Sequence, residues 1–430
     1  MIPRYEVQEM TAIWSDQSRF ETYLQVELAV LKALGDEIPS GVFEEIEKKA
    51  RVNPARIEEI EKLTRHDVIA FCTSITENLR PEIGKYFHYG VTSSDIIDTS
   101  LSLLMKKSSA PVLSAVKDLK TALWDKALRY KNLLAMGRSH GIYAEPFGFG
   151  QKFLGLYREL ERRERDLERV YLEELTGQIS GAVGNYTLLS RKIEEKALAI
   201  LGLPREPLST QVIPRDRIAK IISIHALTAS LIERAALEIR HLHRSEVGEV
   251  YEGFEKGQRG SSTMPHKKNP ISSENLSGMA RILRSHVGMA MENCILWHER
   301  DISHSSTERL YLPDNFGLLV YSLRRLTKTL ENLVVDEERI RGRALENFST
   351  LSSLYLHCLI KHLDLTRDEC YEIVQGAAFK AGSKEDFHNG VILEVEKRGL
   401  SVSALPSPND LASLYLKEVE ALYGDDQALR

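Results

Sequence analysis

The polar side chains that could do chemistry are concentrated in residues 257–274, which interrupt an otherwise helical sequence. Gly257, Gly260, Pro265 and Pro270 keep this stretch out of its neighbouring helices, because glycine adopts left-handed backbone angles and proline lacks an amide hydrogen. The stretch carries hydroxyl, imidazole, ammonium and carboxamide groups at Ser261, Ser262, His266, Lys267, Lys268 and Asn269. Taken alone, it is either an exposed surface loop or a loop that carries function.

Further polar islands lie at residues 65–67, 88–95, 137–146 and 297–309. His66, His88 and His140 fall within these breaks, where loops most often carry function. Histidine titrates near neutral pH and is suited to proton transfer, although a histidine in a connecting turn is commonly only solvent-exposed. His225 and His243 instead occupy regularly spaced helical positions, so we expect them to be core or interface residues.

The composition is that of an ordinary folded protein. The chain has 430 residues, 43% of them hydrophobic and 28% charged, and a net charge of −5. This charge gives no support to general nucleic-acid binding. The four cysteines form no CxxC pair and predict neither a disulfide framework nor a zinc site. We find no signal peptide and no membrane-spanning run, and expect a cytoplasmic protein.

The elements that must position these groups are predicted to be helices throughout. Apolar residues repeat in steps of three and four after Pro214, after residue 275 and after residue 318, which predicts long helices packed nearly parallel. No strand pattern competes with them. The expected fold is all-α, with an N-terminal helical domain (1–92), a central long-helix bundle (93–340) and a C-terminal helical domain (341–430).

The polar islands cannot all meet within one subunit if they form one site. A helix from about residue 97 to 132 spans roughly 50 Å. It would place Thr92 and Ser93 far from His140. Other subunits must then supply the missing groups, and symmetric packing of long helices into a homotetramer would do so.

The order of residues in the 257–274 stretch is more specific than its composition. The string Gly-Ser-Ser-x-Met-Pro-x-Lys-x-Asn-Pro, followed by Glu274, resembles the signature loop of the fumarase/aspartase lyase superfamily. Residues 4–5, 88–95, 209–216 and 303–309 resemble the branch of that superfamily that acts in purine nucleotide biosynthesis. The resemblance covers about residues 1–340, and residues 348–353 follow the family poorly, so no role is carried over there.

The resemblance implies a β-elimination that needs no cofactor and no metal. The expected substrates are adenylosuccinate, cleaved to AMP and fumarate, and the succinylated ribotide SAICAR, cleaved to AICAR and fumarate. A base removes a proton next to a carboxylate, and an acid protonates the departing nitrogen. By resemblance His140 is the acid, Ser261 the base, and Lys267 stabilises developing negative charge, while Glu274 orients His66.

The same resemblance implies a set of residues that contact the substrate. Guanidinium groups are suited to the nucleotide phosphate because they offer paired donors. Ser139 stands where the family usually has threonine and keeps the hydroxyl. The implied binding residues are Arg4, Tyr5, Arg65, Asp67, His88, Thr92, Ser93, Ser139, Gln211, Ser262, Lys267, Asn269, Asn275, Arg300, Ser306 and Arg309.

Two alternatives remain open. A sister lyase acting on argininosuccinate, aspartate or malate would share the signature loop, although Ser306 and Arg309 favour a nucleotide substrate. A non-catalytic structural relative, like the lens crystallins of this superfamily, would keep the fold, although the presence of both His140 and Ser261 argues against it.

Overall fold

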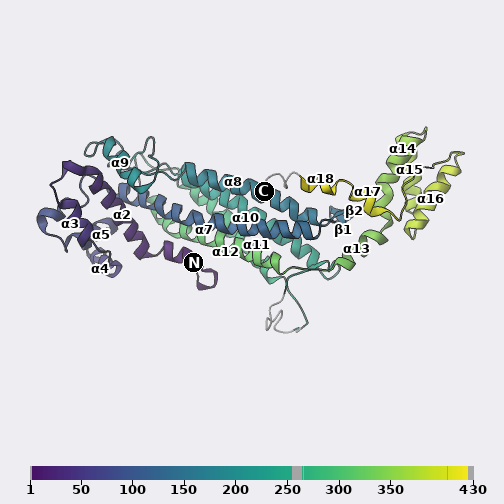
Figure 1. The fold of residues 1–430 in the computed structure, drawn as a ribbon, viewed down its shortest axis with the longest axis horizontal. Coiled ribbons are helices and arrows are strands. Elements are labelled where there is room, and N and C mark those ends of the chain that lie inside the picture. The colour runs from purple at the N-terminus through teal and green to yellow at the C-terminus, as the bar shows by residue number, and fades with distance from the viewer. Residues whose placement is uncertain (1, 254–263, 265, 404, 425–430) are drawn as a thin grey trace. The chain divides into compact units, whose positions relative to one another are not determined.

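The computed structural model describes residues 2–253, 264, 266–403 and 405–424 (Figure 1). The described chain is mainly helical, with a few short strands, which confirms the predicted fold class. It divides into two compact units. Unit 1 comprises residues 1–119, 160–236 and 274–326, and unit 2 comprises residues 120–159, 237–273 and 327–430.

Unit 1 contains the shorter helices of the first half of the chain and most of the long ones. The shorter elements are η1 (Pro3–Tyr5), α1 (Gln8–Ile13), α2 (Asp16–Leu34), η2 (Gly35–Glu37), α3 (Val42–Lys49), α4 (Pro54–Thr64), α5 (Asp67–Thr76), α6 (Pro81–Gly84) and α9 (Arg191–Leu201). The long helices, which contribute residues to both units, are α7 (Ser93–Arg129), α8 (Gly150–Glu173), α10 (Asp216–His243), α11 (Ile271–Glu292) and α12 (Ser303–Glu331).

The packing of α2 against α5 positions several of the groups discussed below. Ser15 caps α2 by accepting a hydrogen bond from the amide of Ser18 at 3.2 Å. Phe20 of α2 and Phe71 of α5 stack with their ring centroids 6.0 Å apart, and Tyr23 meets Phe71 edge to face. These contacts fix the two helices against each other within the core of unit 1.

The evenly spaced residues of α10 are buried, as predicted. Within unit 1, Ile222, Ala229, Ile232 and Ala236 have no exposed surface, and the long helices lie side by side (Figure 1). His225 is also fully buried, and its two ring nitrogens lie 2.6 Å from the Tyr171 hydroxyl and 2.5 Å from Asn315 Oδ1. It is a core histidine with both nitrogens paired.

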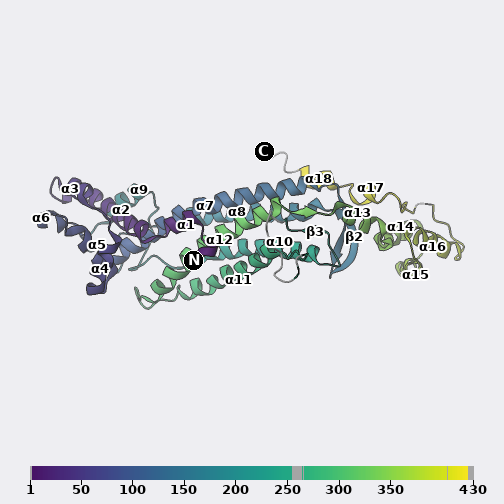
Figure 2. The ribbon, with the colours of Figure 1, turned by 90° about the horizontal axis from the view of Figure 1, so that it is seen from below.

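Unit 2 combines parts of the long helices with two small sheets and the C-terminal helices. Its remaining elements are β1 (Leu134–Ser139), β2 (Ile142–Gly148), β3 (Val250–Tyr251), β4 (Val334–Val335), α13 (Glu337–Glu346), η3 (Phe348–Leu351), α14 (Ser352–His362), α15 (Arg367–Ala378), α16 (Lys384–Glu396), α17 (Leu411–Tyr415) and α18 (Val419–Gly424). Helices α14, α15 and α16 pack in sequence, and Figure 2 shows them side by side. They share a core with Leu134 and Met136 of β1.

The β1–β2 hairpin corrects the prediction that no strands occur. The two strands pair antiparallel, with Ser139 opposite Ile142, so His140 and Gly141 form a two-residue turn. Both turn residues have positive φ, 56° and 80°, as the tightest hairpin turns require. The strands carry buried residues mainly at their bases, so the alternating pattern that identifies a strand is short and was missed.

No helix in the described part of the chain is both long enough and apolar enough to span a bilayer.

Candidate active site

A cavity of about 200 Å³ in unit 1 gathers several residues that the sequence singled out. Arg300 and Arg309 line it together with Ser94, the second residue of α7. The sequence did not single out two other lining residues, Arg19 of α2 and His304 of α12. With Arg215, which also lines it, four guanidinium groups and a histidine therefore surround one cavity.

A buried ion cluster forms one wall of this cavity. Arg215 is 4% exposed and makes paired contacts with Asp98, at 2.6 and 2.9 Å, and with Glu308, at 2.9 and 3.2 Å. Although burial alone would lower the pKa of Arg215, the two carboxylates hold it above its ordinary value. Burial raises the pKa of Glu308 to about 6, against the lowering effect of Arg215. Because its donors are taken by carboxylates, Arg215 supports the wall rather than offering its charge to a ligand.

Four buried nitrogens on the lining have no hydrogen-bond partner among the described residues: Trp14 Nε1, Arg19 Nε, Arg300 Nε and His304 Nδ1. Arg300 uses Nη1 to donate to Gln211 Oε1 at 2.9 Å, which brings a third predicted residue to the cavity. Burial, followed by the charge of Arg215, lowers the pKa of His304 to about 4, so its ring is neutral near pH 7. Unpartnered polar atoms on a cavity wall are costly unless a ligand or water satisfies them, which favours a polar, anionic ligand here.

Arg309 connects the cavity to the 65–67 island. Its Nη2 lies 2.5 Å from Asp67 Oδ2, and Asp67 is the first residue of α5. His66 is the N-cap of that helix and accepts a hydrogen bond from the amide of Ile69 through Nδ1, at 3.4 Å. Arg65, which ends α4, has a positive φ of 54°. The structure thus places Arg65, His66 and Asp67 in one tight turn beside Arg309.

The 88–95 loop is anchored by Asp95, which is buried. Its carboxylate accepts hydrogen bonds from the amides of Thr92 at 2.8 Å, Ser180 at 3.0 Å and Gly181 at 3.2 Å. Burial raises the pKa of Asp95 to about 6, although these three amides lower it. The anchor fixes the start of α7, and with it Thr92 and Ser93, whose side chains are half-buried.

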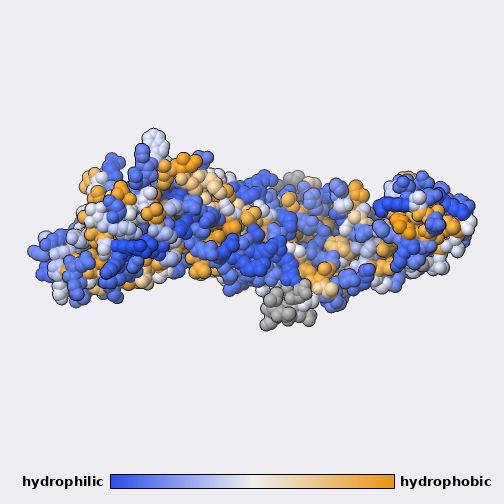
Figure 3. All heavy atoms as spheres, turned by 90° about the horizontal axis from the view of Figure 1, so that it is seen from above, coloured by the Kyte–Doolittle hydropathy of each residue, from blue (hydrophilic) through white to orange (hydrophobic). Residues whose placement is uncertain are grey.

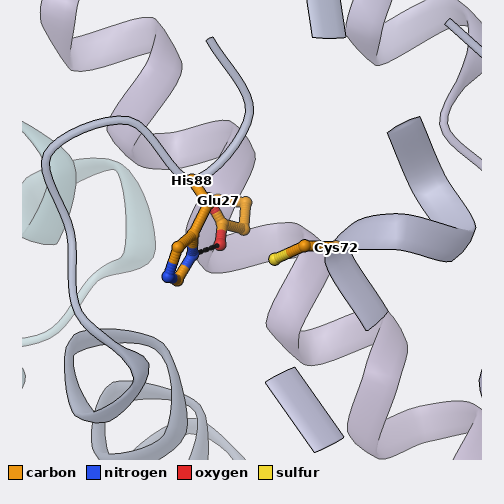
Figure 4. A group of neighbouring side chains, drawn as sticks. All are labelled: Glu27, Cys72 and His88. Atoms are coloured by element: carbon orange, nitrogen blue, oxygen red, sulfur yellow. Dashed lines mark hydrogen bonds and ion pairs between the residues drawn. The ribbon is translucent and has the colours of Figure 1, made fainter. Parts of the chain in front are cut away.

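His88 is the first residue of this loop and has a positive φ of 62°. Its Nδ1 lies 2.6 Å from Oε1 of Glu27, a carboxylate only 1% exposed on α2 (Figure 4). Burial alone would lower the pKa of His88, but the hydrogen bond and charge of Glu27 raise it above its ordinary value. Five described non-glycine residues have positive φ, and Arg65, His88 and His140 are three of them. Strained backbone of this kind gathers at functional sites.

The remaining predicted residues of unit 1 lie outside the cavity lining. Tyr5 packs edge to face on Tyr321, at 5.3 Å between centroids, and the Tyr321 hydroxyl donates to Asn275 Oδ1 at 3.1 Å. Ser306 donates to the Ser303 carbonyl at 3.1 Å, within the first turn of α12. Arg4 and Glu274 are exposed. Within the described part of this chain, Glu274 makes no hydrogen bond to His66, so the predicted pairing stays a prediction.

Unit 2 holds the other predicted groups. Ser139 and His140 lie at the end of β1 and in the hairpin turn, where His140 is exposed. Lys267 and Asn269 precede α11, whose first turn is held by Glu252: it accepts from the amides of Ser272 and Ser273 at 3.0 and 2.7 Å. His243 Nε2 lies 2.9 Å from the Lys268 carbonyl oxygen. Ser261 and Ser262 lie outside the described residues.

The structure therefore pairs Gln211 with Arg300 and Asp67 with Arg309, and both arginines line one cavity. It adds Arg19, His304 and Glu27, which sequence reasoning missed. His304 lies inside the 297–309 island, and this position was an available signal. Arg19 and Glu27 lie on the regular helix α2, where nothing in the pattern marks them.

Comparison with known proteins identifies the relatives of this chain. A family described as lyase matches residues 4–283. The adenylosuccinate lyase of Thermotoga maritima is 43% identical over 98% of this chain and 99% of its own length. That of Aquifex aeolicus is 43% identical over 92% and 91%, and that of Helicobacter pylori is 46% identical over 88% and 87%.

Solved structures share the fold at lower identity. A fumarate lyase from Mesorhizobium sp. BNC1 superposes with a TM-score of 0.84 at 20% identity, covering 98% of each chain. A 3-carboxy-cis,cis-muconate lactonizing enzyme from Pseudomonas putida gives 0.85 at 24% identity, covering 99% of this chain and 97% of its own. The differing titles of these two enzymes show that the fold alone does not select a reaction.

Proposed function

The chain belongs to the lyase family, and we propose that it is an adenylosuccinate lyase, which eliminates fumarate from adenylosuccinate to give AMP. The observation that carries this proposal is identity of 43–46% with relatives of that name over nearly the whole chain. On the basis of the same family resemblance, we propose that it also converts SAICAR to AICAR and fumarate. It is a purine-biosynthetic enzyme of the cytoplasm.

The arginine-lined cavity of unit 1 supports a nucleotide substrate. A phosphate monoester carries nearly two negative charges. Guanidinium groups bind it through paired hydrogen-bond donors in a fixed geometry. Arg300 keeps an unpartnered buried Nε on the cavity wall, and Arg309 is half-exposed beside it. These two residues bind the phosphate, with Arg19 adding positive charge, and Thr92, Ser93 and Gln211 contact the succinyl part.

His140 and Ser261 carry out the proton transfers. His140 sits in a turn that exposes its ring, as a group that protonates the leaving nitrogen requires. Ser261 removes the proton next to the carboxylate. An isolated hydroxyl is a weak base, so Lys267, Asn269 and exclusion of water stabilise its alkoxide and the developing carbanion.

The active site is shared between the subunits of a homotetramer. The 37 residues of α7 correspond to about 55 Å of helix rise between the loop of Thr92 and the segment leading to His140. Large apolar side chains on the long helices are exposed in the single chain: Leu172 by 76%, Met291 by 50% and Leu227 by 47%. Figure 3 shows hydrophobic residues among hydrophilic ones on one face. Burying such residues between long helices favours assembly.

Product analysis tests the proposal. The purified protein, incubated with adenylosuccinate, should release AMP and fumarate in equal amounts, without any added metal or cofactor. Separation of the products by chromatography measures both. If neither product forms while the protein is folded and assembled, the proposed reaction is wrong.

A further inference from the structure

Glu27, Cys72 and His88 bring a carboxylate, a thiol and an imidazole to one point of unit 1. Their ligand atoms all lie within 4.8 Å of one another. Among the described residues, no other group of three or more histidine, cysteine or acidic side chains meets this criterion. Figure 4 shows the Cys72 sulfur directed toward the Glu27–His88 pair. The three residues come from α2, α5 and the loop after α6. The fold therefore brings them together, and they do not form a sequence motif.

We propose that Glu27, Cys72 and His88 form a binding site for a zinc ion, with three protein ligands and one open position. Thiolate and imidazole select zinc over magnesium or calcium, which prefer sets made only of oxygen ligands. Three ligands from the protein and a fourth place for water is the arrangement of an accessible zinc site.

The charges of the cluster match a divalent cation. Glu27 is 1% exposed and supplies one negative charge, and Cys72 supplies the second when zinc displaces its proton. Without a metal, burial and then the charge of Glu27 raise the pKa of the Cys72 thiol well above its ordinary value, so the thiol stays protonated. Zinc binding therefore releases the thiol proton, and the imidazole of His88 binds the ion through Nδ1 only when that nitrogen carries no proton.

Binding requires His88 to move slightly. Its Nδ1 lies 2.6 Å from Glu27 Oε1, whereas two such ligands on a tetrahedral zinc ion lie about 3.3 Å apart. Glu27 and Cys72 are held on packed helices, while His88 belongs to a loop and its side chain is 26% exposed. The loop residue is therefore the one that adjusts, and its exposed side is the route by which the ion enters.

The consequence is inhibition of the enzyme, and this part rests on the proposed function. Zinc replaces the Glu27–His88 hydrogen bond and occupies the imidazole nitrogen that this bond holds. His88 is a proposed substrate contact, so an occupied site competes with correct placement of the substrate. The metal is an inhibitor in this account and takes no part in the elimination.

Metal titration of the whole protein, stripped with a chelator, tests the site without substrate. Calorimetry should show zinc binding that Mg²⁺ does not reproduce. Co²⁺ should give a thiolate-to-cobalt charge-transfer band, which reports directly on cysteine ligation. Cys72→Ser should abolish that band and weaken zinc binding about tenfold or more, while Cys294→Ser, which changes an exposed cysteine, should leave both unchanged.

Measurements of turnover with and without zinc provide the second test. Cys72 has no proposed role in the reaction, so Cys72→Ser should keep wild-type turnover and lose its sensitivity to zinc. The site is refuted if wild-type protein gives no cobalt band, or if Cys72→Ser binds zinc as tightly as wild type. Zinc binding without inhibition would refute the competition with substrate and leave the site standing.

Discussion

At the scale of single residues, some charged side chains stabilise the fold, whereas others remain available to bind a ligand. Arg215 is buried and fully engaged by Asp98 and Glu308. Arg300 shares the same cavity but is held by the neutral Gln211 and keeps a buried nitrogen without a partner. Composition cannot distinguish these two arginines, because the difference arises only when α7, α12 and the loop before α10 meet.

Replacing Arg309 with methionine should mainly impair substrate binding. The variant keeps an unbranched, flexible side chain but loses the guanidinium and its paired donors to phosphate, so KM for adenylosuccinate should rise about tenfold or more with a smaller change in kcat. Arg191→Met, which removes an exposed arginine paired with Glu195, is the matched control. Since the change also frees Asp67, the melting temperature is measured alongside. An unchanged KM would remove Arg309 from the site.

His225 should make the protein less stable in acid. Burial lowers its pKa to about 4, so it stays neutral in the folded chain while the unfolded chain takes up a proton below its ordinary value of 6.5. Stability is therefore lost as pH falls from about 6.5 toward 4. Between pH 7.5 and 5 this group should lower the unfolding free energy by about 2 kcal/mol.

Urea denaturation of wild type and His225→Gln at these two pH values measures the effect. Glutamine keeps one donor and one acceptor for Asn315 and Tyr171 but does not titrate, so the variant should show a smaller loss in acid. His362→Gln, at an exposed histidine, should behave as wild type. An equal pH dependence in His225→Gln and wild type would show that His225 is not the group responsible.

At the scale of elements, the helices are what the sequence predicts best. Regular spacing of three and four residues identified α10, α11 and α12, because long buried faces repeat over many turns. The β1–β2 hairpin was missed since its strands are short and its turn depends on the backbone angles of His140 and Gly141. His140 itself was identified only through resemblance, as its spacing alone fits an ordinary exposed turn.

Contacts between distant elements could not be predicted. Glu27 and His88 are 61 positions apart, and Arg309 and Asp67 are 242 apart, so no local pattern records either pair. The cavity on which the nucleotide proposal depends has the same origin. The family resemblance identified the residues at several positions of the cavity. It did not identify the neighbouring side chains that determine whether those residues stay available to a ligand.

The start of α11 should depend on Glu252. This buried carboxylate accepts from two amides and, at 2.6 Å, from the Ser273 hydroxyl, and it complements the positive end of the helix. Glu252→Gln replaces one acceptor oxygen with a donor, which should cost about 1–2 kcal/mol. Because Lys267 and Asn269 precede this helix, kcat should fall as well.

Thermal unfolding and steady-state kinetics measure both effects. Glu292→Gln, in the exposed last turn of the same helix, should change neither. If Glu252→Gln keeps both the melting temperature and the kcat of wild type, the anchor does not position this segment.

At the scale of the whole molecule, the proposed tetramer makes a prediction that a single-chain site would not. His140→Ala and Ser261→Ala should each lower turnover by about 10² to 10⁴, since each removes a proton-transfer group. Mixed and allowed to exchange subunits, the two inactive variants should recover part of the activity, because some sites then draw both intact groups from different chains. No recovery after demonstrated exchange would place both groups on one subunit.

The most direct test of the central claim is kcat/KM for fumarate release, measured on wild-type enzyme with adenylosuccinate, argininosuccinate, aspartate and malate. Elimination from all four gives fumarate, and they differ in the leaving group, which carries a nucleotide only in adenylosuccinate. The arginine-lined cavity and the close relatives predict a kcat/KM for adenylosuccinate at least about a thousandfold higher than for the other three, as sites built around a specific polar group achieve. Comparable or greater efficiency with any of the other three would contradict the account.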